Sequence, residues 1–103
     1  MMAKFTDQYR AEARLLILRG LAEEGDGTLS SKLLSRKLQV YGINQDRDWI
    51  HEEMRHLERF GGITITDADT VLVGTITTKG RSHLARRLQI GGVDWPTDPI
   101  ITE

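Results

Sequence analysis

The chain of 103 residues contains no cysteine, only two prolines and no long apolar run. Without cysteine it has no disulfide framework and no thiolate zinc site, so cysteine-based metal sensing is excluded. No apolar run approaches the length of a membrane span, and the N-terminus lacks the apolar segment of a secretory signal. We therefore expect a cytoplasmic protein without a membrane segment.

Basic residues are also missing from one region. Residues 61–77 carry only Asp67 and Asp69, whereas residues 78–90 carry four basic side chains and no acid. The net charge of −1 therefore hides an uneven distribution. A length of 103 residues, with 39% apolar and 28% charged residues, indicates one ordinary globular domain.

Helical spacing of apolar residues predicts two helices in the first 42 residues. The first begins near Thr6 or Asp7, either of which would cap it, and ends at residues 25–27. Its apolar stripe is broad, which indicates burial on more than one side, by the rest of the fold or by a partner chain. The second begins at Ser30 or Ser31 and ends at a left-handed Gly42. Its predicted buried side is Leu33, Leu34, Leu38 and Tyr41.

Two further helices are predicted later in the chain. The third runs from an Asn44 cap to about Phe60, with Ile50, Met54 and Leu57 on its buried side. The last begins at a Thr78 cap and ends at residues 90–92. It is expected to carry Leu84, Ala85 and Leu88.

Strands are predicted between these helices. Residues 63–66 and 71–76 alternate with period two around a polar turn, which predicts a β-hairpin. Residues 28–29 form a short strand that could pair at its edge. The prediction is an α+β fold of order helix, strand, helix, helix, strand, strand, helix over residues 1–90. An irregular, extended tail covers residues 91–103, in which Trp95 is expected to dock on its own domain or on a partner.

This succession resembles winged helix-turn-helix regulators of the broad ArsR, MarR and PadR type. The resemblance covers residues 28–85 and rests on the capped second helix, Gly42-Ile43, Leu57-Glu58 before a glycine stop, and Thr77-Thr78-Lys79-Gly80. The whole chain also resembles small winged-helix proteins of Mu-like prophages, through residues 14–19, residues 75–85 and the segment Gly92-Val93-Asp94-Trp95-Pro96. The resemblance implies a phage or prophage transcription regulator that binds duplex DNA.

In such a protein, helix 44–60 would enter the major groove. The residues expected at base edges are Asn44, Gln45, Arg47, His51 and Arg55. The residues expected at phosphates are Lys32, Arg36, Lys37, Lys79 and Arg81. A homodimer is expected, because two half-sites double the contacts of a small module. The other interpretation of helix 44–60 is a solvated face of ion pairs.

The acidic hairpin turn and third helix favour a different function, a protein-interaction module for phage assembly or host interaction without affinity for DNA. An accessory subunit of an enzyme complex is a third possibility. No nucleophile elbow is present, so the chain is not expected to be an enzyme. His51 and His56 are five residues apart and diverge by about 140° on a helix, which is unsuited to zinc. We expect no metal and no cofactor, and histidines at the surface or its margin.

Overall fold

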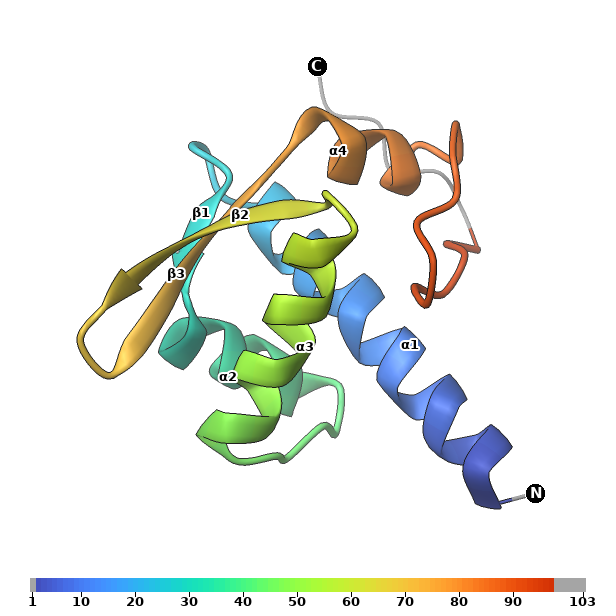
Figure 1. Cartoon of the computed structure of the whole chain (residues 1–103), viewed down its shortest axis with the longest axis horizontal. Coiled ribbons are helices and arrows are strands. Elements are labelled where there is room, and N and C mark those ends of the chain that lie inside the picture. Colours follow the sequence, from blue (N-terminus) through green and yellow to red (C-terminus); the bar gives the residue numbers. More distant parts are fainter. Residues whose placement is uncertain (1, 98–103) are drawn as a thin grey trace.

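The computed structural model describes residues 2–97, with side chains from Phe5 onward. In chain order these residues form α1 (Met2–Ala22), β1 (Thr28–Ser30), α2 (Ser31–Val40), α3 (Arg47–Arg59), β2 (Ile63–Ala68), β3 (Val71–Ile76) and α4 (Thr78–Leu84) (Figure 1). The predicted α+β order is therefore confirmed. None of the helices within residues 2–97 is long and apolar enough to cross a membrane.

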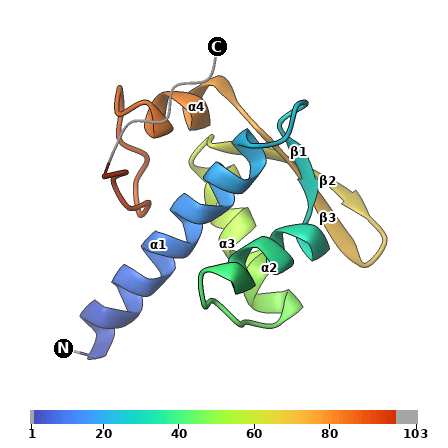
Figure 2. The same cartoon turned by 180° about the vertical axis from the view of Figure 1, so that it is seen from behind.

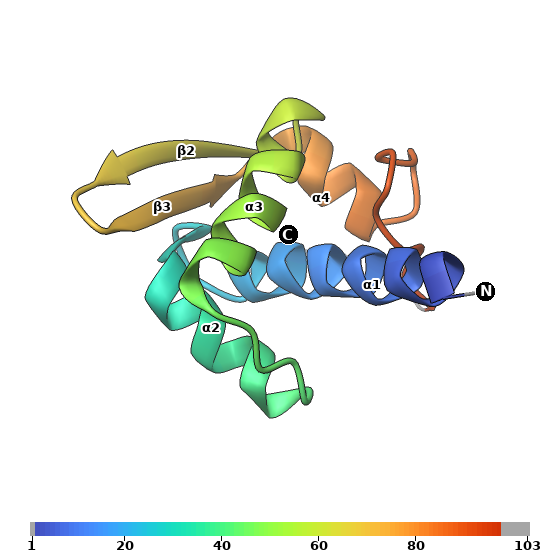
Figure 3. The ribbon, with the colours of Figure 1, turned by 60° about the horizontal axis from the view of Figure 1, so that its bottom comes forward.

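The three strands form one antiparallel sheet with β3 in the middle, between β1 and β2. The predicted pairing of the short strand with the hairpin is confirmed. Ala68 lies opposite Val71, so only Asp69 and Thr70 form the turn, and Asp69 takes a left-handed φ of 61°. The tip of the β2–β3 hairpin extends away from the helices (Figure 3).

Helix α1 is the centre of the core. It contacts the other three helices, β1 and β3, and its N-terminal end projects beyond them (Figures 1 and 2). Ala13, Ile17, Leu18 and Leu21 are fully buried within the single chain. Each large aliphatic side chain buried in this way contributes about 1.5–3 kcal/mol. The fold itself therefore accounts for the broad apolar stripe, which needs no partner chain to cover it. The helix begins at Met2, so the predicted caps near its start are wrong.

A buried carboxylate fixes α3 against α1. The side chain of Glu53 is 1% exposed, and its Oε1 accepts a hydrogen bond of 2.6 Å from Nε of Arg14. Its Oε2 accepts a second bond from Arg10, whose guanidinium also lies over the ring of Trp49. Arg14 donates further to the carbonyl of Gly92, at 2.7 Å. This network joins α1, α3 and the C-terminal segment, which comprises residues 85–97.

Helices α3 and α4 are capped by residues other than those predicted. Asp46, not Asn44, caps α3, because its backbone is extended and its side chain accepts the N–H of Trp49 at 2.9 Å. Thr77, not Thr78, caps α4 for the same reason. In each case the residue whose side chain reaches the third N–H of the helix is the cap.

Helix α2 confirms Ser30 as its cap and a left-handed Gly42 beyond its end, at φ 83°. Its predicted buried side is too wide. Leu34 and Leu38 are buried, whereas Leu33 is 43% and Tyr41 is 55% exposed. Leu34, Leu38 and Ser31 are the buried residues of the helix, so the covered stripe is narrower than predicted.

Helix α4 ends at Leu84, well before the predicted stop, because Arg86 takes a left-handed φ of 61°. Consequently Leu88 lies outside the helix and is 36% exposed. Residues 85–97 form no helix or strand. The sequence predicted this only for the tail that begins at residue 91, because the last helix was expected to continue to residues 90–92.

The C-terminal segment is packed against its own domain instead of being extended. His83 is fully buried, which corrects the prediction of surface histidines. Its Nδ1 accepts the N–H of Ile90 at 3.1 Å, and its Nε2 lies 2.8 Å from the carbonyl of Asp94. The ring of Trp95 meets the imidazole edge-on at 5.5 Å. The docking of Trp95 on its own domain is thus confirmed, whereas residues 98–103 of the predicted tail lie outside the described residues.

Candidate nucleic-acid interface

Helix α3 presents one side to the solvent because the opposite side is in the core. Ile50, Met54 and Leu57 are buried, as predicted. The cap at Asp46 sets where the helix begins, so its first exposed turn carries Arg47 and Asp48. The side chain of Arg47 is 61% exposed, and among the described residues it forms one ion pair, a long one of 3.6 Å to Asp48. Arg47 is therefore available to an external anion.

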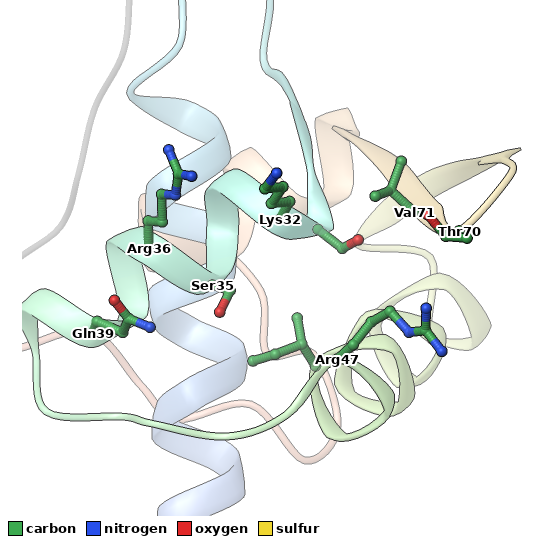
Figure 4. Close-up of a pocket in the computed structure, with 9 residues that line it drawn as sticks. Lys32, Ser35, Arg36, Gln39, Arg47, Thr70 and Val71 are labelled. Atoms are coloured by element: carbon green, nitrogen blue, oxygen red, sulfur yellow. The ribbon is translucent and has the colours of Figure 1, made fainter.

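A cleft of about 330 Å³ lies between α2, the start of α3 and the tip of the hairpin. Three cations line it, Lys32 and Arg36 from α2 and Arg47 from α3, and no acidic residue of the described part of the chain does. Neither Lys32 nor Arg36 forms an ion pair within residues 2–97. Figure 4 shows Lys32 and Arg36 extending from one side of α2 and Ser35 from the other, with Arg47 on the start of α3 across from Ser35. This surface is suited to an anion.

The N-terminus of α2 opens at the same place. Ser30 accepts the N–H of Leu33, and the two preceding amides belong to Ser31 and Lys32, which line the cleft. Free amides in the first turn of a helix, together with the helix dipole, favour a phosphate group. The cleft therefore combines side-chain cations with the positive end of a ten-residue helix.

The space between α3 and the hairpin has a different electrostatic character. Its volume is about 360 Å³, and Asp48, Asp67 and Asp69 line it together with Arg47 and Arg55. Arg55 donates to Glu58 at 3.1 Å and to Asp67 at 2.8 Å. The hydrogen bond to Glu58 is the largest cause of a raised pKa of Arg55; desolvation opposes it, and the charges of Asp67 and Glu58 raise the pKa further. In this structure Arg55 is engaged within the chain.

His51 links three elements. Its Nε2 lies 2.9 Å from Oγ of Ser31, which also accepts the N–H of Leu72 at 3.1 Å. This junction joins α2, α3 and β3, and it leaves only Nδ1 of His51 for an external group. Burial lowers the pKa of His51, and the positive charge of Arg47 lowers it further. The neutral imidazole is therefore favoured in the folded protein.

The two remaining residues predicted at base edges precede α3. Asn44 and Gln45 are exposed in the loop that leads to Asp46. The amide of Asn44 donates to the carbonyl of Gly42 at 3.4 Å, and that of Gln45 donates to the hydroxyl of Tyr9 at 3.1 Å. Both lie in the loop that ends at the Asp46 cap, two and three residues before Arg47, and neither is among the described residues that line the cleft.

Three residues predicted at phosphates are not part of this surface. Lys37 donates to Glu24, Glu23 and the carbonyl of Gly20 on the other side of α2. Its pKa is raised, because these carboxylates outweigh the desolvation that lowers it. Lys79 lies beside Gly61 at the far end of α3, and Arg81 lies against Gly27. The three cations are spread over separate places and do not form one patch with Arg47.

Within residues 2–97, no three or more histidine, aspartate or glutamate side chains come together as a group that could hold a metal ion. Sequence reasoning missed Glu53 and His83 as organising residues, because their partners on α1 and in the C-terminal segment are far away in the chain.

No known protein family, no curated protein and no solved structure matches this chain.

Proposed function

We propose that this chain is a winged helix-turn-helix protein that binds duplex DNA, with α2 and α3 as the helix-turn-helix, α3 as the recognition helix and the β2–β3 hairpin as the wing. The element order supports this, as do the exposed side of α3 and the projecting hairpin. In such an arrangement the N-terminal part of the recognition helix reaches base edges, and the preceding helix contacts the backbone.

The observation that carries the proposal is the basic cleft along α2 and the start of α3. Lys32, Arg36 and Arg47 line it without an acidic neighbour in its wall. Phosphate neutralisation supplies much of the affinity of proteins for DNA. A strand that passes along this cleft meets three cations and the N-terminus of α2.

Base contacts would come from residues beside this cleft. Arg47 has the paired donors that suit guanine, and Asn44 and Gln45 have the amide groups that suit adenine. His51 would contribute through Nδ1 alone, since Nε2 is bonded to Ser31. Sequence-specific binding by this set is consistent with a regulatory role, such as the control of transcription.

The hairpin supports a second candidate function, a protein-interaction module. Asp67 and Asp69 place negative charge where a DNA-binding wing would meet phosphate. Val40 and Tyr41 at the end of α2 are 81% and 55% exposed. Binding through Val40 and Tyr41 would depend little on salt, whereas binding to DNA weakens steeply as salt rises.

The test is fluorescence anisotropy with a labelled duplex at two salt concentrations. We expect binding at low salt and weaker binding for Lys32→Ala, Arg36→Ala and Arg47→Ala. Each change should make the slope of log affinity against log salt shallower by about 0.9.

Arg87→Ala is the matched control, because Arg87 is an exposed arginine beyond α4. It removes the same charge away from the cleft and should leave the slope unchanged. The proposal fails if the wild-type protein binds no duplex at low salt. It also fails if the control weakens binding as much as the three cleft variants do.

A further inference from the structure

Arg55 belongs by position to the exposed side of the recognition helix. Arg47, His51 and Arg55 are spaced four residues apart, and all three line the space between α3 and the hairpin. The guanidinium of Arg55 is nonetheless occupied at both of its terminal nitrogens. Nη1 donates to Glu58 and Nη2 donates to Asp67.

The two carboxylates on Arg55 have different origins. Glu58 is a neighbour on the same helix, three residues on, whereas Asp67 comes from strand β2 of the hairpin. The bond to Asp67 is the shorter, at 2.8 Å, and spans the space where DNA would lie along α3. A carboxylate and a phosphate oxygen compete for the same guanidinium donors.

We propose that Asp67 acts as an internal competitor of DNA phosphate for Arg55, so that the acidic hairpin tip holds the affinity for duplex below what the helix alone would give. The inference rests on the proposed function. When DNA binds, the Nη2 donor of Arg55 leaves the carboxylate for a phosphate oxygen. Asp69, at the turn, adds repulsion but contacts no arginine within residues 2–97.

The two effects of the hairpin acids are separable. The side chain of Asp67 is 70% exposed and that of Arg55 is 38% exposed, so their ion pair is screened by water. Breaking such a pair changes an equilibrium by about two- to fivefold. Asp67→Asn should therefore tighten binding about two- to fivefold beyond the effect of removing one charge. The slope of log affinity against log salt should change only as it does when one hairpin charge is removed, because Arg55 reaches a phosphate in both the wild type and the variant.

The experiment is a double-mutant cycle on the full chain, measured by anisotropy with a mixed-sequence duplex. Asp69→Asn measures the removal of one hairpin charge that pairs with no arginine. Asp67→Asn should exceed it in affinity, whereas the two variants should change the salt slope alike. In the Arg55→Ala background, Asp67→Asn should give only the effect of Asp69→Asn. Thermal melting of each variant checks that the fold is retained, and Asp67→Ser repeats the test with a second side chain.

The outcomes separate the two proposals. If the wild-type protein binds duplex but Asp67→Asn and Asp69→Asn raise the affinity for duplex by the same factor, this inference is overturned and the proposed function stands. The same holds if Asp67→Asn keeps its full effect without Arg55. If the wild type binds no duplex at low salt, the proposed function is overturned together with the inference that rests on it.

Discussion

Replacing Glu53 by glutamine should destabilise the protein far more than the same change at its neighbour Glu52. Both glutamates lie on α3 and contact Arg10, but the Glu53 side chain is 1% exposed and that of Glu52 is 66% exposed. Removing one partner of a buried ion pair costs about 3–5 kcal/mol, because the other charges stay desolvated. Arg10 is 28% exposed and can turn toward Glu52 or solvent, so we expect the lower end, about 3 kcal/mol.

That loss is large for a domain whose unfolding free energy lies in the usual range of about 5–15 kcal/mol. At about 4–8 °C per kcal/mol, Glu53→Gln should lower the melting temperature by about 12–24 °C. For Glu52→Gln we expect about 0.2–1 kcal/mol, as for an exposed pair. Circular dichroism during thermal and urea unfolding measures both. The reasoning is refuted if Glu53→Gln costs less than about 1 kcal/mol, which is within the range of an exposed pair.

The other expectations concern packing and protonation. Gly80→Ala places a Cβ 2.4 Å from the carbonyl of Gly62, so it should lower the free energy of unfolding in urea by about 1–3 kcal/mol. Gly25→Ala is the control, because its Cβ meets nothing within 4 Å and should leave that free energy nearly unchanged. The pKa of His51 in the folded protein is lowered from 6.5, so the unfolded chain binds more protons below that pH. The free energy of unfolding should therefore fall as pH drops below about 6.5, and His51→Gln should make this fall smaller. Equal pH profiles of wild type and variant would contradict this expectation. Trp95→Ala should cost about 1 kcal/mol or more through the lost ring contacts, and an unchanged melting temperature would refute its docking.

The order of helices and strands could be predicted from the sequence because it depends on local periodicity. Ile50, Met54 and Leu57 repeat at helical spacing, and they are all buried. The ends of the elements were harder to predict, since several side chains near each start can cap a helix. Asn44 and Asp46 are both suitable residue types, and only the backbone conformation decides for Asp46.

Interactions between distant parts of the chain explain what the sequence could not show. Glu53 looks like a surface charge on its own helix, until Arg10 and Arg14 of α1 are placed beside it. From the sequence, Arg55 is expected to be free to contact a base, but the folded hairpin places the carboxylate of Asp67 against its guanidinium. For the candidate interface, residue types alone could suggest Lys32, but they could not separate it from Lys37, which forms ion pairs with two glutamates in the turn after α1.

A titration of the ¹⁵N-labelled protein with duplex DNA at low salt tests the proposed interface most directly. The account predicts amide shift changes within residues 31–36 and 44–51, at the starts of α2 and α3, that vanish as salt is raised. Shift changes confined to α4 and residues 85–97, or none at all, would contradict it.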